Sequence, residues 1–462
     1  MDRRTYLTTA AAASGLAIAG CTGEGETSDD QGGELNTADG DDDSSETAGG
    51  EETDEERNEQ GDENETDDGD EGSDADDETS TDEDGTSDEE DETDDDEDEN
   101  QPGIVGTFDD FEDVGPWQEF LGSMHVDTER SALGTQSVVM SPNDDGTARI
   151  RRELEEPIDV RDVAPGIATT ADGPGWVLIQ LQDPDGNYVE YSQRIQGNTP
   201  FVRTNYGLTR VRGDPDPDRV TLIQFVRWFH GSGTQFWVDD LHFVPEPDTG
   251  KVMIHFRGGH ESHHERGLPL LEEFDLTGTA FVPTERIGSG GSWLTVDELD
   301  GLASSGWTIG SYGALGRPVS GLGDDDLNRE IASSRAWLDE HGYGDGPHVF
   351  AFPDAQYDEA AYELVQQEYD LAFSGQSRSQ GYAGNQHLCT VAEPPSNAEE
   401  GAELVDWTAE IGGITSIPFD ALDDGSLAAL EAAAERLADH RSTGDLELLT
   451  PAQMASDHLF TE

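Results

Sequence analysis

The sequence predicts a multidomain chain in which a disordered acidic segment precedes an all-β sandwich and then an α/β domain with parallel strands. Three observations lead to this prediction. Residues 22–101 are of low complexity and carry few apolar side chains, and short strand-like runs separated by turn residues follow as far as about Pro245. From Val252 onward, apolar runs and helical spacings alternate in the order β-α-β-α-β. The 462 residues are enough for about two or three domains.

Residues 1–21 have the features of an export signal rather than of a folded element. Arg3 and Arg4 precede an apolar stretch that ends in Ile18-Ala19-Gly20-Cys21. This arrangement resembles a twin-arginine signal that ends in a prokaryotic lipobox, which implies cleavage before Cys21 and lipidation of its thiol. We therefore expect export by the twin-arginine route and a lipid anchor in the outer face of the cytoplasmic membrane, at the cell surface. An ordinary secretory signal with an incidental cysteine is the alternative.

Acidic side chains set the electrostatics of the whole chain. The formal net charge is −81, and Lys251 is the single lysine. A surface so rich in carboxylates and so poor in lysine resembles that of proteins from extreme halophiles. Such a field repels nucleic acid, so we expect no nucleic-acid partner. Once Cys21 is assigned to the lipid, Cys389 remains alone, which predicts a buried thiol and no intramolecular disulfide.

Residues 22–102 form the predicted linker. They consist mainly of Asp, Glu, Ser, Thr and Gly, so they can bury too little apolar surface to offset the entropy of ordering. Mutual repulsion of the carboxylates favours an extended chain. We expect this segment to be a disordered tether that holds a folded head away from the lipid anchor.

Residues 103–247 are predicted to form a β-sandwich. The segments Phe108–Glu112 and Trp237–Phe243 resemble the first and last strands of galactose-binding-like jelly rolls. That resemblance implies sugar binding and a structural calcium ion held by Asp110 and Asp240, since calcium prefers oxygen ligands. A purely structural sandwich with an acidic surface is the alternative. The strand-like runs, separated by turn-forming residues, are Ser137–Met140, Trp176–Leu181, Val220–Trp228 and Phe236–Val244.

Aromatic residues of the predicted sandwich strands allow two interpretations. Trp176, Tyr191 and Trp228 are candidates for a sugar-binding face. Aromatic side chains are also typical of strand interiors, where they pack in the core. The sequence leaves both alternatives open.

The α/β domain is predicted from local patterns. The runs Val252–Phe256, Thr279–Val282 and Gly306–Ser311 read as strands. Leu268, Leu271 and Phe274 have helical spacing between the first two strands, and Thr295 with Glu298 forms a capping-box signature before a second helix. Strands that alternate with helices in this way are parallel and are covered by those helices.

Residues 251–462 resemble the polysaccharide deacetylase family, the NodB-homology domain. The resemblance rests on motifs along most of this region, and it implies a distorted (β/α) barrel of about seven strands with its site at the carboxyl ends of the strands. The matching segments are Lys251–Gly259, Gly278–Val282, Leu294–Gly316, Asn328–Leu338, Val349–Pro353 and Leu448–Met454.

The resemblance also implies which chemistry is missing. In the family, one aspartate is the general base, and a second aspartate with two histidines holds a divalent metal, usually zinc, which activates water. No histidine is found in Ile414–Asp420, where the family's late acid is expected. We therefore expect no intact catalytic set and no zinc at the family's site. The family's base, metal aspartate, two metal histidines and third-motif arginine fall at Arg257, Gly258, Tyr312, Gly316 and Ala351.

A second group of residues is consistent with an active enzyme. His255 lies in the first strand run and could reach in from it, and His260 and His264 have a helical i, i+4 spacing that can place two imidazoles on one face. They are candidate ligands of a relocated metal; a polar, solvated loop is the alternative.

Two functions follow from these patterns. The favoured one is a cell-surface lipoprotein whose polysaccharide deacetylase-like domain binds or acts on envelope or extracellular glycans and is inactive at the family's metal site. The other is an active metal-dependent carbohydrate deacetylase, a hydrolase of carbon–nitrogen bonds other than peptide bonds. The expected partners are a glycan and, through Cys21, the membrane.

Overall fold

The structure, a computed structural model, describes residues 104–229 and 234–461. The predicted export signal and the whole predicted linker, with Arg3, Arg4 and Cys21, lie outside these residues. Between Gly106 and Pro245 the chain forms two antiparallel sheets. One sheet has the order β3 (Ser123–Asp127), β4 (Ser137–Ser141), β12 (Phe236–Pro245), β6 (Val163–Ala171) and β9 (Val202–Thr204), and β1 (Gly106–Asp109) also pairs with β12.

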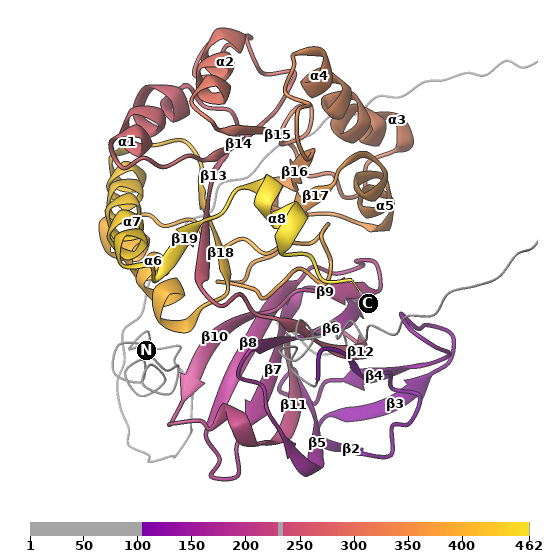
Figure 1. Ribbon diagram of the computed structural model, residues 1–462. Helices are drawn as coiled ribbons and strands as arrows, with labels where there is room; N and C mark the ends of the chain where they lie inside the picture. Colours follow the sequence, from indigo (N-terminus) through magenta and orange to yellow (C-terminus); the bar gives the residue numbers. More distant parts are fainter. Residues whose placement is uncertain (1–103, 230–233, 462) are drawn as a thin grey trace, which may run out of the picture. The chain divides into compact units, whose positions relative to one another are not determined.

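The second antiparallel sheet, which we call the arginine sheet, carries most of the long strands of this region. Its order is β10 (Gly207–Arg212), β8 (Tyr188–Ile195), β7 (Gly175–Gln182), β11 (Val220–Phe229), β5 (Thr147–Ile158) and β2 (Trp117–Leu121). Figure 1 shows β10, β8, β7, β11 and β5 side by side. The four predicted runs are therefore strands, as β4, β7, β11 and β12.

The two sheets share one hydrophobic core, as strand alternation requires. Ile179 and Phe225 of the arginine sheet and Phe236 of the other sheet belong to the same buried cluster. Trp117 stacks on Phe225 with ring centroids 4.9 Å apart. The sandwich is present as predicted, while its jelly-roll connectivity stays a prediction.

The C-terminal region is built on a seven-stranded sheet in which every pair is parallel. The alternation of strands and helices read from the sequence is confirmed. The strand order is β17 (Leu371–Phe373), β16 (Val349–Ala351), β15 (Thr308–Ser311), β14 (Thr279–Val282), β13 (Gly250–Arg257) and β18 (Ile414–Phe419), with β19 (Leu446–Leu448) also paired to β13.

Helices surround this parallel sheet (Figure 1). The capping box predicted at the start of one of them is present: Glu298 N donates to Thr295 Oγ1 at 3.3 Å, and Thr295 N donates to Glu298 Oε2 at 2.7 Å. The helices are α1 (Leu268–Glu273), α2 (Val296–Ser304), α3 (Asp324–Asn328), α4 (Ser334–Glu340), α5 (Glu359–Glu368), α6 (Ala398–Ile411), α7 (Asp424–Thr443) and α8 (Pro451–Asp457). Within the described part of the chain, no helix is long and apolar enough to cross a membrane.

Strand β13 separates two sides of the barrel wall. Val252, Ile254 and Phe256 belong to the cluster that contains the apolar faces of α6 and α7. Met253 belongs to a different cluster with Phe281 and Phe373 on the interior side. Because side chains alternate along a strand, His255 and Arg257 also face the interior. This alternation places Arg257 at the carboxyl end of the strand, inside the barrel.

Candidate functional site

Three polar side chains gather where parallel strands end, which is where barrel enzymes place their sites. Arg257 is the last residue of β13, Tyr312 follows β15, and Asp420 follows β18. These strands are brought together by hydrogen-bonded pairing, since β13 lies beside β18 and β14 lies between β13 and β15. The site therefore draws on segments that are far apart in the sequence.

Arg257 and Asp420 form a two-point ion pair at this strand end. The Nε atom of Arg257 lies 3.1 Å from Oδ1 of Asp420, and an Nη atom of the same guanidinium lies 3.1 Å from Oδ2. The Arg257 side chain is 20% exposed and the Asp420 side chain 56% exposed. Bidentate pairing of this kind fixes both groups in orientation as well as in distance. The position implied for the general base is thus occupied by a cation that holds a carboxylate.

Two of the implied metal-ligand positions have no side chain. Gly258 has φ 93° and Gly316 has φ 71°, a region of backbone space that favours glycine. A Cβ atom added to Gly316 would lie 3.2 Å from Cβ of Pro283. Restoring aspartate or histidine at these positions would therefore strain the backbone, and at Gly316 it would also crowd Pro283.

Tyr312 and Ala351 occupy the remaining implied positions. Burial raises the pKa of the Tyr312 hydroxyl, and the charge of Asp420 raises it further, while Arg257 opposes both. The phenol therefore stays protonated at neutral pH and is a poor metal ligand. Ala351 lies in β16 and packs in the interior apolar cluster. A cation, two glycines and a protonated phenol do not fit a zinc ion.

His255 lies in an aromatic environment inside the barrel. It is fully buried, and its ring meets Phe281 and Phe373 edge-on with centroids 5.0 and 4.6 Å away. Among the described residues, neither ring nitrogen has a hydrogen-bond partner. Burial lowers the pKa of His255 to about 3, helped by the charge of Arg257. The imidazole is therefore neutral at physiological pH.

The histidines that follow β13 have separate partners. His260 stacks on Trp293 with ring centroids 5.3 Å apart. His264 lies against α2, since a Cβ atom on Gly301 would come within 3.0 Å of its Nε2. Residues His263–Gly267 form a π-helical turn, so the simple helical spacing assumed for His260 and His264 does not apply. Within residues 104–229 and 234–461, no group of three His, Cys, Asp or Glu side chains could hold a metal ion.

His263 connects the histidine segment to the ion pair. It is fully buried, and its Nε2 lies 3.0 Å from the backbone oxygen of Asp420. Burial lowers its pKa to about 3. The neutral ring can donate to this oxygen, which places the turn after β18 beside the turn after β13. His263 therefore supports the position of Asp420.

The acidic residues singled out in the sandwich each have protein partners. Asp240 Oδ1 accepts hydrogen bonds from Arg203 Nη2 at 3.0 Å and from Thr107 Oγ1 at 2.9 Å. Asp110 is exposed, and its Oδ1 accepts from Glu112 N at 3.1 Å. The bond to Arg203 supplies the positive charge that a calcium ion would otherwise supply to Asp240.

Cys389 lies in the apolar interior of the barrel. It is buried, and burial raises the pKa of its thiol to about 12. The thiol is therefore protonated at neutral pH, as expected of a structural rather than a reactive cysteine.

Asp420 is the site residue that sequence reasoning left without a role. It is the last residue of Ile414–Asp420, the segment in which a late histidine is expected. The signal for it in the sequence is its place at the end of a buried parallel strand. Its partner Arg257 is 163 positions away, so no local spacing links the two.

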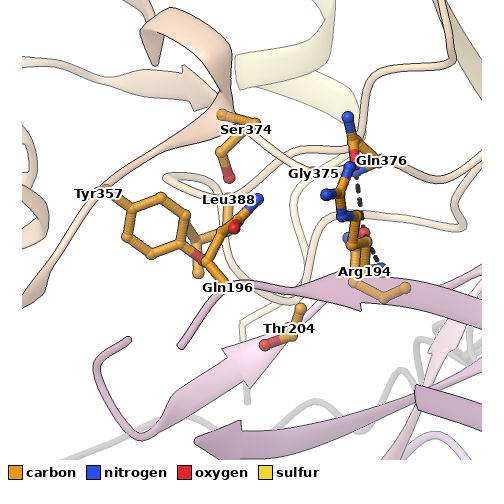
Figure 2. A pocket seen from close by; sticks show the side chains of 10 residues that line it. Arg194, Gln196, Thr204, Tyr357, Ser374, Gly375, Gln376 and Leu388 are labelled. Carbon is orange, nitrogen blue, oxygen red and sulfur yellow. Dashed lines mark hydrogen bonds between the residues drawn. The ribbon is translucent and has the colours of Figure 1, made fainter. Parts of the chain in front are cut away.

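A small pocket is lined by residues of the sandwich and the barrel. Figure 2 shows Arg194 and Gln376 on one side of it and Tyr357 and Ser374 on another. Arg194 Nη1 donates to Gln376 Oε1 at 2.6 Å, and Gln376 N donates to Gln193 Oε1 at 2.9 Å. Polar side chains dominate this pocket.

Comparison with known proteins identifies part of the chain. Residues 245–372 match the model of the polysaccharide deacetylase family, "Polysaccharide deacetylase". This match supports a polysaccharide deacetylase domain at these residues, as the sequence motifs suggested. Curated proteins provide no match.

Three of the solved structures to which part of this chain is similar are described by their identity, TM-score and coverage. A family 4 acetyl xylan esterase from Clostridium thermocellum has 18% identity and a TM-score of 0.33, with 44% of this chain and 89% of that chain covered. A family 4 carbohydrate esterase from Streptomyces lividans has 13% identity and a TM-score of 0.33, with coverage of 46% and 97%. A peptidoglycan deacetylase from Bacillus subtilis has 15% identity and a TM-score of 0.32, with coverage of 45% and 91%.

Proposed function

We propose that this protein binds glycans through a polysaccharide deacetylase domain that does not hydrolyse them at the strand ends of the barrel. The ion pair between Arg257 and Asp420 carries this proposal. Hydrolysis of an amide or ester at such a site needs a base that can take a proton from water. A guanidinium remains protonated at any physiological pH and cannot act as that base.

Glycan binding does not require a catalytic base. Hydrogen bonds from charged groups and stacking of a sugar ring on an aromatic side chain need neither a metal nor a base. Arg257 and Asp420 supply a donor and an acceptor at the strand ends, and Trp293 supplies an aromatic surface in the adjoining loop. These groups support a binding role for the same face of the barrel.

The cellular setting of this proposal comes from residues outside the described structure. Arg3, Arg4 and Cys21 motivate export by the twin-arginine route and a lipid anchor at the cell surface. The acidic residues 22–102 then connect anchor and head. In that setting the glycan partner is a polysaccharide of the envelope or of the surroundings.

A second candidate function is an active deacetylase with a displaced site. The observation that favours it is His260, whose pKa is lowered by burial so that the ring is neutral at pH 7. A neutral imidazole at a strand end can accept a proton from water. This candidate requires a further group to polarise the carbonyl.

The test measures binding and metal content on the full chain in molar salt. Isothermal titration with acetylated and deacetylated oligosaccharides is expected to show binding that Arg257→Ala weakens, and metal analysis after incubation with zinc is expected to show less than stoichiometric zinc. Stoichiometric zinc that is lost in His260→Ala would favour the second candidate. Absence of binding to any oligosaccharide would refute the proposed function.

A further inference from the structure

The outer face of the arginine sheet carries a concentration of cationic side chains. Residues that alternate with the core positions of β5, β7, β8, β10 and β11 point away from the core shared by the two sheets. In a chain of net charge −81, this face collects five arginines. They are Arg149, Arg151, Arg194, Arg210 and Arg212.

Strand register places these side chains in rows across the sheet. One row runs in direct register from strand to strand, and it begins and ends with an arginine. In order, its members are Arg151, Gln224, Gln180, Glu190 and Arg210. Side chains directly opposite one another on one face lie close enough to act on a single ligand.

A second row supplies aromatic surface. Trp228 lies directly opposite Trp176, and Trp176 lies opposite Arg194. Trp228 is 41% exposed, which is unusual for so large an apolar side chain and leaves a ring face open to a ligand. Trp176 also lines an open hollow together with Thr209 and Arg378.

The acidic groups of this face leave its charge positive. Glu190 is 4% exposed; its Oε2 accepts a hydrogen bond from Gln180 Nε2 at 2.6 Å, and its Oε1 lies 3.8 Å from Nε of Arg210, so it offsets the charge of that one arginine. Glu153 is exposed and lies 3.8 Å from Arg151. The Nε atom of Arg149 is buried and has no hydrogen-bond partner among the described residues. Burial lowers the pKa of Arg149, with Tyr188 and Glu190 opposing the change.

An exposed aromatic side chain lies on β2, the edge strand next to β5. Phe120 is 51% exposed, and the guanidinium groups of Arg149 and Arg151 lie 5.7 and 5.2 Å from its ring centre. The guanidinium planes are thus positioned by the ring while their outer edges remain donors. The face therefore offers aromatic surfaces at two places, with guanidinium groups beside Phe120 and an arginine opposite Trp176.

We propose that the outer face of the arginine sheet binds a polysaccharide whose sugar units carry carboxylates. Planar guanidinium groups match carboxylates in two-point hydrogen bonds, and Trp228 with Trp176 offers the flat surface on which a sugar ring stacks. Arginines recur at every second position along β5, as Arg149 and Arg151, and along β10, as Arg210 and Arg212. This spacing fits an extended polymer with charges at intervals. The proposal deepens and rests on the proposed glycan-binding function, but it does not depend on the chemistry of the barrel.

The test compares two glycans of equal length on the full chain in molar salt. A decamer of galacturonic acid is expected to bind at least about tenfold more tightly than a neutral xylose decamer, since each charge-assisted hydrogen bond contributes on the order of 1.5 kcal/mol or more. Arg149→Gln combined with Arg151→Gln is expected to remove that preference. Trp228→Ala is expected to weaken binding of both decamers.

Controls separate folding from recognition. Arg210→Gln lies on the edge strand β10 at an exposed position and should retain the parent circular dichroism while losing part of the preference. Arg436→Gln, a comparably exposed arginine of α7, should leave binding unchanged. Equal affinity for both decamers in the parent protein would overturn this inference while leaving the barrel proposal intact, and binding of neither would overturn both. Equally tight binding of a poly-glutamate peptide would mark a general polyanion surface and also overturn it.

Discussion

The guanidinium of Arg257 holds the carboxylate of Asp420 through two hydrogen bonds of 3.1 Å at the carboxyl ends of β13 and β18. Arg257 falls at the position that the sequence resemblance implies for a general base, and Asp420 ends the segment in which the resemblance implies a late histidine. The pairing involves two of the five N–H donors of the guanidinium and one hydrogen bond to each carboxylate oxygen. The pair joins the ends of two neighbouring parallel strands.

The first prediction concerns the strength of this pair. A double-mutant cycle with Arg257→Ala and Asp420→Ala should give a coupling free energy of unfolding of about 0.5–1 kcal/mol, because the Asp420 side chain is 56% exposed and water screens the pair. The matched control is the pair Arg266 and Asp424, whose carboxylate is fully exposed and whose coupling should be smaller. Chemical unfolding in molar salt measures both. Larger coupling in the control pair would contradict the assigned geometry.

The second prediction concerns pH and His255. Its pKa falls from an ordinary value near 6.5 to about 3 in the folded protein, so the unfolded chain takes up the proton first as the pH drops. The stability associated with the neutral ring is present above pH 6.5 and is lost as the pH falls from there toward 3. His255→Phe keeps an aromatic ring beside Phe281 and Phe373 but cannot titrate.

Unfolding curves at pH 7 and pH 5 test this assignment. Between pH 7 and pH 5 the parent should lose about 2 kcal/mol more in total than His255→Phe, because the full slope of about 1.4 kcal/mol per pH unit is reached only below pH 6.5. Since the buried ring nitrogens of His255 have no partner among the described residues, the variant should also be at least as stable as the parent at pH 7. The same pH dependence in both proteins would show that His255 does not titrate as assigned.

Local patterns in the sequence predicted the strands and the capped helix because their causes are local. Alternating or continuous apolar runs identified β7, β11, β12, β13 and β14, and the spacing of Thr295 and Glu298 identified the start of α2. The parallel order followed from the alternation of elements. These features depend on residues a few positions apart.

Features formed by distant segments could not be predicted in this way. Asp420 becomes a partner of Arg257 only after β18 pairs with β13. Strand β5 was not recognised, because Arg149, Arg151 and Arg152 interrupt the apolar pattern. The cationic face emerges only when the register of β5, β11 and β8 is known, although the alternation of arginines along β5 was a signal in the sequence.

A third prediction follows from the charge of the chain. The acidic, lysine-poor composition should make folding depend on molar salt, because counterions screen the repulsion among carboxylates. Near-ultraviolet circular dichroism of the full chain, recorded as salt is removed by dialysis, should show loss of tertiary signal that returns when salt is restored. A signal that persists unchanged in dilute buffer would contradict this expectation.

A fourth prediction concerns the proposed anchor. Cys21→Ser removes the thiol that would carry the lipid, so the variant should be released to the medium or accumulate as an uncleaved precursor. Fractionation of cells that express the parent or the variant gives the answer. Cys389→Ser is the matched control and should stay with the membranes like the parent. Membrane association of Cys21→Ser equal to that of the parent would refute the lipid anchor.

The most direct test of the central claim is acetate release by the full chain in molar salt with added zinc. Acetylated xylo-oligosaccharides and N-acetylglucosamine oligomers serve as substrates for ester and amide cleavage. With Arg257 in place of a base and glycine at positions 258 and 316, the account predicts no acetate above the level without protein. Acetate release that His260→Ala or His264→Ala abolishes would contradict it and establish a displaced active site.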